Sequence, residues 1–288
     1  MNSTTGSDNY WVVRNIWLDG NAANNPSSRG LAYFRGFRAL VQNVVGGGCA
    51  GEGIVLDFRG KNNLTWATPL GGGTAAETHF DNVTVFATGK QGFFSRGKYA
   101  EISTLNADVY VRDMNLSNCG YLGYDSMLIE RSAGWKISGC QIYQPGKSCM
   151  RILSPGRTIV TGNHCDVENP TAVVSGDIIG GIVIGSETGL TNISNIVLSN
   201  NTVNMNDIPI VSGATYAGIA FIANNLLWGV SVGGNSINDL NGVGSPLQKF
   251  YFSGGNGSGG GARFFGNSGS ALIAAGHEPP PEFTFDMG

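Results

Sequence analysis

Short runs of alternating hydrophobic and polar residues recur along the whole chain. In the first run, Asn15–Leu18, Ile16 and Leu18 face one side of an extended strand and Trp17 faces the other. The turn sequence DGN follows directly. Alternation with a period of two that ends in glycine and asparagine is typical of β-strands, and helical periods of three and four residues are nearly absent. The pattern therefore predicts an all-β protein.

This strand recurs as a template in which asparagine, aspartate or glycine precedes an apolar–x–apolar run. The nine copies begin at Asn15, Asn43, Asn82, Asp113, Gly139, Gly162, Asn200, Gly234 and Gly266. A second template, usually a small residue before apolar–x–apolar, falls between them. Its copies begin at Gly30, Gly53, Gly92, Ser126, Cys149, Gly181, Gly218 and Lys249. A fixed strand pair with connections of variable length is typical of a solenoid whose turns carry insertions.

We therefore expect about eight or nine β coils in one domain, residues 11–270, between a polar segment, residues 1–10, and a tail, residues 271–288. The opening NIWLDGN, the SNNTV and GGNSI strands and the glycine–isoleucine partner strands resemble the pectate-lyase-like superfamily, which includes phage tailspike depolymerases. The resemblance implies a right-handed, single-stranded parallel β-helix. It also implies a polysaccharide partner and an extracellular or virion-associated location. The superfamily includes lyases, hydrolases, epimerases and receptor-binding spikes, so the resemblance does not choose among these functions.

Four asparagines occupy the same inward position in successive C-terminal repeats: Asn163, Asn201, Asn235 and Asn267. A buried amide is stable only if its hydrogen bonds are made. Amides stacked about 4.8 Å apart can bond to each other and to the turn backbone. We expect these four residues to be structural.

Composition narrows the classes of partner. The chain has 45 glycines among 288 residues, is 41% hydrophobic and only 13% charged, which is unlike a disordered chain. A net charge of -3 gives no electrostatic basis for binding nucleic acid. No apolar run approaches the roughly 20 residues that span a bilayer, and MNSTTGSDNY lacks the features of an export signal. We expect neither a nucleic-acid nor a membrane partner.

The five cysteines have no CxxC pair and no neighbouring histidine cluster, so they indicate neither a disulfide framework nor a zinc site. We expect them to be small buried residues. No metal or organic cofactor is expected, with a calcium ion left open.

The outward positions of the second template contain a cluster of charges in successive coils. These outward positions form two columns with one residue per coil, and the first coil contributes Ala32 to one column and Phe34 to the other. The charged residues that follow, our predicted catalytic residues, are Asp57, Arg96, Glu130 and Arg151. The two carboxylates would lie two coils apart, roughly 9 to 10 Å between backbones, near the separation of about 6.5 to 9.5 Å in inverting glycosidases. The arginines could bind a substrate carboxylate or keep a carboxyl group ionised.

Further residues are predicted to bind substrate. Trp66 lies in a long insertion and is placed to stack on a sugar ring. Tyr121, Tyr124 and Asp125 lie in the turn that leads into Glu130. The outward column of the first template is mostly polar, a surface for glycan hydroxyls or for a neighbouring subunit. It runs Trp17, Val45, Thr84, Asn115, Gln141, His164, Thr202, Ser236 and Ser268.

These residues predict a protein that cleaves an acidic or neutral polysaccharide, as a hydrolase or a lyase. Three alternatives stay open. The charges could form a salt-bridge ladder on a solvated face, without chemistry. The protein could be a non-catalytic glycan-binding or receptor-binding spike, and a homotrimer if it is tailspike-like. It could also be a purely structural solenoid.

Overall fold

The structure, a computed structural model, describes residues 11–27, 30–34, 38–56, 77–97, 106–185, 192–222, 226–239, 248–253, 262–268 and 283–286. Every helix or strand in these ranges is a β-strand. The same ranges contain no helix that could cross a membrane. The predicted all-β class is confirmed. Asp57 and Trp66 lie outside the described residues.

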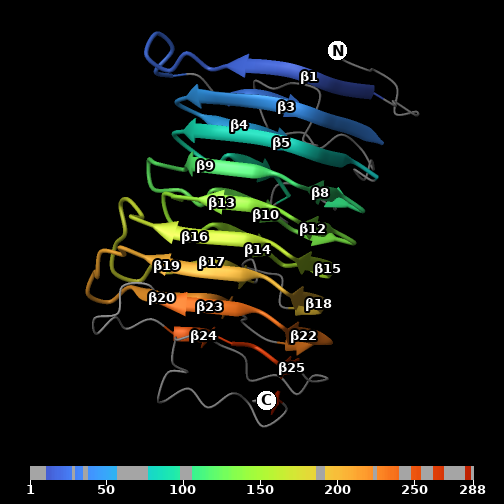
Figure 1. Cartoon of the computed structure of the whole chain (residues 1–288), viewed down its shortest axis with the longest axis vertical. Helices are drawn as coiled ribbons and strands as arrows, with labels where there is room; N and C mark the ends of the chain where they lie inside the picture. The colour runs from blue at the N-terminus through green and yellow to red at the C-terminus, as the bar shows by residue number, and fades with distance from the viewer. Residues whose placement is uncertain are drawn as a thin grey trace.

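The strands form two parallel sheets, stacked along the long axis of the molecule from β1 at one end (Figure 1). The smaller sheet contains β2 (Gly30–Phe34), β4 (Glu52–Leu56), β6 (Phe93–Ser95), β10 (Met127–Glu130), β14 (Met150–Leu153), β17 (Ile178–Gly185), β20 (Thr215–Ile222) and β24 (Gln248–Ser253). The larger sheet contains β1 (Trp11–Asp19), β3 (Ala39–Cys49), β5 (His79–Thr88), β7 (Asn106–Ala107), β8 (Tyr110–Arg112), β9 (Asn115–Cys119), β11 (Ser132–Ala133), β12 (Lys136–Ser138), β13 (Gln141–Tyr143), β15 (Gly156–Thr161), β16 (His164–Glu168), β18 (Asn192–Ser199), β19 (Thr202–Asn206), β21 (Leu226–Trp228), β22 (Val230–Gly233), β23 (Ser236–Asp239), β25 (Ala262–Phe265) and β26 (Phe283–Asp286).

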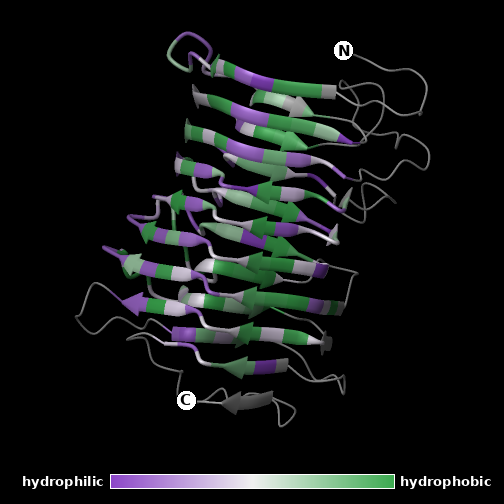
Figure 2. Ribbon diagram, turned by 45° about the vertical axis from the view of Figure 1, so that its right-hand side comes forward, coloured by the Kyte–Doolittle hydropathy of each residue, from purple (hydrophilic) through white to green (hydrophobic). Residues whose placement is uncertain are grey.

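The chain passes repeatedly from one sheet to the other, and each strand pairs with its equivalent in the next repeat. Thus β3 pairs with β5 in the larger sheet, while β4 pairs with β6 in the smaller one. One hydrophobic cluster runs from Phe34 to Phe264, and hydrophobic residues recur in strands along the whole stack (Figure 2). Long parallel sheets around a continuous core are consistent with a β-solenoid.

The residue that leads the first template has a left-handed backbone in all nine copies, with φ between 50° and 66°. Only glycine adopts this conformation without cost, and asparagine and aspartate tolerate it best among the other residues. The need for a left-handed bend before each strand explains why asparagine, aspartate or glycine leads every copy. In the first three copies the asparagines also stack, because the Asn43 amide donates to Asn15 Oδ1 at 3.0 Å and the Asn82 amide to Asn43 Oδ1 at 2.8 Å.

The predicted ladder of buried asparagines is confirmed. Each Nδ2 donates to Oδ1 of the next asparagine at 2.9 Å, from Asn163 through Asn201 and Asn235 to Asn267. Each backbone N–H of the first three also donates to that same oxygen. The second hydrogen of each amide reaches a main-chain carbonyl of the preceding coil. The amides are therefore satisfied by one another and by the turn backbone.

All five cysteines are buried and free, as expected. Desolvation by burial raises the pKa of Cys119 and of Cys140 to about 12. These thiols are therefore neutral packing groups rather than nucleophiles at ordinary pH.

The predicted outward column of the first template is confirmed from Trp17 to Ser268 by the strand register. After the first coil, the predicted outward columns of the second template are confirmed by the register over Val55, Phe94, Leu128, Arg151, Val183, Ala220 and Tyr251, and over Glu130, Leu153, Gly185, Ile222 and Ser253. The first coil was predicted wrongly. Ala32 pairs with Ile54 and Phe34 with Leu56, so both take core positions. Residues 31–34 are all apolar or aromatic, so alternation could not fix the register there, and a slip of one residue exchanges the two faces.

Candidate functional site

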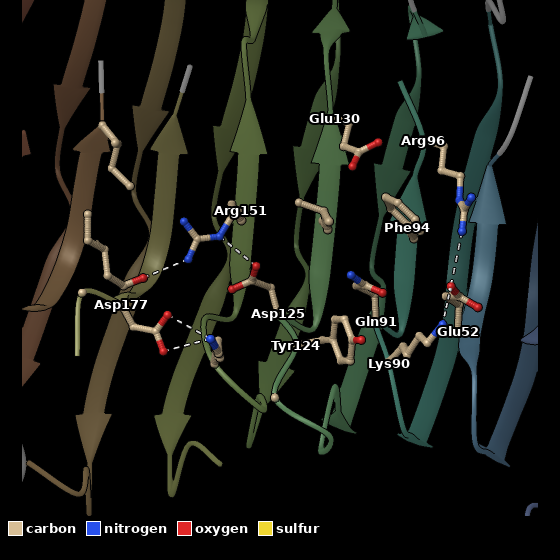
Figure 3. A pocket seen from close by; sticks show the side chains of 16 residues that line it. Glu52, Lys90, Gln91, Phe94, Arg96, Tyr124, Asp125, Glu130, Arg151 and Asp177 are labelled. Atoms are coloured by element: carbon tan, nitrogen blue, oxygen red, sulfur yellow. Dashed lines mark hydrogen bonds and ion pairs between the residues drawn. The ribbon is translucent and has the colours of Figure 1, made fainter. Parts of the chain in front are cut away.

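A groove with a volume of about 660 Å³ opens on the outward face of the smaller sheet (Figure 3). Its residues lie in six neighbouring strands, β4, β6, β10, β14, β17 and β20, or directly beside them in the chain. Four carboxylates and four cations line it, and their formal charges cancel. They are Glu52, Asp125, Glu130, Asp177, Lys90, Arg96, Lys147 and Arg151.

One end of the groove is organised around Glu52, which is only 3% exposed. Its Oε1 lies 3.5 Å from Lys90 Nζ and 3.4 Å from Arg96 Nη2. The Arg96 guanidinium also lies over the Phe94 ring, 4.9 Å from its centroid, which adds a cation–π contact. A buried carboxylate needs such partners, because an isolated charge would lose its hydration without compensation.

The other end is organised around Arg151. Its Nε donates to Asp125 Oδ2 at 2.8 Å, and its Nη2 donates to the Ile178 carbonyl at 2.9 Å. Asp125 accepts a second hydrogen bond, from the Ser148 backbone N–H at 3.1 Å. The Arg151 side chain therefore links three successive coils of the smaller sheet.

Asp177 forms a further ion pair, with Lys147 Nζ at 2.9 Å, and accepts the Val174 backbone N–H at 2.9 Å. Partial burial alone raises the pKa of Asp177. The hydrogen bonds from Lys147 and Val174 outweigh that effect and hold the pKa below its ordinary value of 3.8.

Glu130 lies at the end of β10 and is 3% exposed. Its Oε2 accepts the backbone N–H of Gly97 at 3.1 Å. Arg96, one coil earlier, and Arg151, one coil later, line the same groove. Glu130 is therefore mostly buried and also lines the groove. A residue that exchanges a proton with a ligand must lie within hydrogen-bond reach of it.

Gln91 is an uncharged polar residue of the groove. It is 6% exposed and lines the groove, and in the view of Figure 3 it lies between Asp125 and Glu52. Within the described part of the chain, its Oε1 has no hydrogen-bond partner. Native proteins rarely leave a buried amide oxygen unsatisfied, so this atom needs an explanation.

The structure brings five predicted site residues to the groove: Arg96, Glu130, Arg151, Tyr124 and Asp125. Tyr121 is 36% exposed on the same turn as Tyr124 and is not among the groove residues. Trp17 and His164 lie on the larger sheet. Trp17 is 68% exposed beside Phe86, and His164 Nε2 lies 3.0 Å from Asp166 Oδ1.

Five polar residues of the groove were not predicted from the sequence: Glu52, Lys90, Gln91, Lys147 and Asp177. The strand templates ignored them because they lie in turns or at strand starts. A signal was present, because Glu52, Gln91 and Asp125 each directly precede a copy of the second template. Extending that template by one residue would have found this third polar column.

Among the residues that the structure describes, no group of three or more histidine, cysteine, aspartate or glutamate side chains could hold a metal ion. No family model and no curated protein matches the chain.

Proposed function

We propose that the chain is a right-handed, single-stranded parallel β-helix of about eight or nine coils, of the pectate-lyase-like type, and that its groove binds and cleaves a polysaccharide. The observation that carries the proposal is the run of paired charges along one open groove on a parallel sheet. Six neighbouring strands about 4.8 Å apart span roughly 24 Å from the first backbone to the last. A groove of this length, lined by hydrogen-bonding groups, suits an extended polymer.

In this proposal Glu130 exchanges a proton with the glycosidic oxygen, and Arg96 and Arg151 position the sugar on either side of it. Asp57 is the proposed second carboxylate. The protein would act as an extracellular or virion-associated depolymerase.

The test is to incubate the protein with neutral and acidic polysaccharides and to follow reducing ends and the ultraviolet absorbance of unsaturated products. Reducing ends alone indicate a hydrolase, and both signals indicate a lyase. Glu130→Gln should lower the rate by about 100-fold or more. Asp166→Asn, on the larger sheet, is the matched control and should cleave at the rate of the unmodified protein. Unchanged cleavage by Glu130→Gln would exclude it from the chemistry.

A specific observation favours a second candidate, a glycan-binding or receptor-binding module without catalysis. Glu52, Asp125 and Asp177 are all engaged by cations in the groove wall, which suits recognition as well as catalysis. Retained polysaccharide binding without any product would support this candidate. A trimer in light scattering would favour a spike.

A further inference from the structure

The cations and carboxylates of the groove are paired with one another, and this pairing affects whether the groove can bind a charged sugar. Each of the four cations has a carboxylate partner within the wall. Lys90 and Arg96 share Glu52, Lys147 pairs with Asp177, and Arg151 pairs with Asp125. Because four carboxylates already balance the four cations, a ligand carboxylate would have to compete with them and would give the groove a net negative charge.

Gln91 interrupts this series of ion pairs. The Gly53 N–H donates to the Gln91 carbonyl, and the Gly92 N–H donates to the Ser126 carbonyl. These bonds place Glu52, Gln91 and Asp125 at equivalent positions in three successive coils, about 4.8 Å apart. The two carboxylates are held by cations or by backbone N–H groups, whereas Gln91 presents an unsatisfied buried amide oxygen.

An amide carries both hydrogen-bond donors and an acceptor, which matches a sugar hydroxyl that donates one bond and accepts another. The aromatic side chain of Tyr124 lines the same part of the groove, as Figure 3 shows, and offers an apolar surface to the ring of a sugar. Gln91 and Tyr124 therefore supply uncharged groups to this part of the groove, and the formal charges of the whole groove cancel.

We propose that the groove selects uncharged sugar residues over uronic acids, and that Gln91 determines this specificity by binding a sugar hydroxyl between Glu52 and Asp125. The inference rests on the proposed function of the groove as a polysaccharide site. It narrows that function to neutral segments of the polymer.

The first experiment uses pairs of polymers that differ only in charge. Polyuronates of several linkages and the same polymers after carboxyl reduction are titrated against the purified protein by calorimetry. At least one reduced polymer should bind tenfold or more tightly than its parent acid. If the parent acids bind as well or better, the neutral specificity is wrong while the groove remains a polysaccharide site. If no polymer binds, the proposed function fails and the inference fails with it.

The second experiment tests Gln91 directly, with a neutral polymer that binds. Gln91→Leu should weaken binding about fivefold or more, as expected for one lost hydrogen bond. Gln91→Glu should weaken it further, because it adds a third carboxylate between Glu52 and Asp125. Gln42→Leu, at a partly buried position of β3 on the larger sheet, is the matched control and should bind normally.

The unfolding midpoint of each variant separates recognition from structure. Gln91→Leu should unfold at or above the temperature of the unmodified protein, because it removes an unsatisfied buried amide. Normal affinity of Gln91→Leu for the neutral polymer would overturn the assignment of Gln91.

Discussion

Two regions of this molecule stack polar side chains in the same way, one per coil, yet they differ in how those side chains are satisfied. In the asparagine ladder, Oδ1 of Asn201 accepts two hydrogen bonds and its Nδ2 donates two, all to the protein itself. In the groove, the column that starts at Glu52 contains Gln91, whose Oε1 has no partner among the described residues.

The difference separates a structural column from a column that we propose binds a ligand. A self-satisfied ladder needs nothing from outside the chain, and its members are at most 2% exposed from Asn163 to Asn235. The groove column contains one buried amide oxygen without a partner among the described residues, on a residue that lines the groove, and we propose that a ligand supplies this partner. Satisfaction of hydrogen bonds, rather than polarity itself, distinguishes the two regions.

The largest expected effect comes from breaking the ladder. Asn201→Leu leaves the Asn163 amide, its backbone N–H and the Val160 carbonyl without their partner inside the core. Each buried unsatisfied group costs about 1 to 3 kcal/mol, so we expect the free energy of unfolding to fall by about 3 kcal/mol or more. Chemical denaturation measures this change.

The matched control is Asn115→Leu, in the outward column of the larger sheet, where the asparagine side chain is only half-buried. Its free energy of unfolding should change by less than about 0.5 kcal/mol. If the two variants were equally stable, the ladder would not be a structural element.

A smaller loss is expected when one partner of a groove ion pair is removed. Arg151→Met leaves Asp125, which is 8% exposed, without its guanidinium, although the Ser148 N–H remains. We expect destabilisation by about 2 kcal/mol, below the cost of breaking a fully buried pair because Arg151 is partly exposed.

Adding Asp125→Asn to Arg151→Met should restore most of the lost stability, since an amide oxygen can still accept the Ser148 N–H without carrying a charge. Thermal unfolding of the single and double variants checks this. Absence of any recovery would mean that the loss is one of packing rather than of an unpaired charge.

The smallest effect is expected for an ion pair outside both regions. Arg112 forms two hydrogen bonds to Asp81 at 2.8 Å on the larger sheet, but its side chain is 55% exposed. Arg112→Gln should change the free energy of unfolding by less than about 0.5 kcal/mol, and added salt should reduce the difference further. A loss as large as that of Arg151→Met would show that exposure does not separate the two pairs.

The sequence predicted much of the fold because the strand template repeats. Asn15 and its equivalents mark the left-handed bend before each strand. Alternation with a period of two indicates which side chains face the core. The prediction was wrong by one residue in the first coil, where residues 31–34 give no alternation. In the site, Arg96, Glu130 and Arg151 were found because they occupy positions of the second template, whereas Glu52 and Gln91 were missed because they lie one residue before it.

The sequence by itself determined the all-β class, the order of the coils and the stacking of Asn163, Asn201, Asn235 and Asn267, since each depends on a pattern that recurs along the chain. Only the tertiary structure decided which charges pair across coils, as Arg151 does with Asp125 and Arg96 with Glu52. It also decided that Gln91 lies buried between them. The physical reason is that periodicity fixes which face a residue occupies, whereas the partner of a side chain depends on its distance to atoms that lie 26 to 44 residues away in the chain.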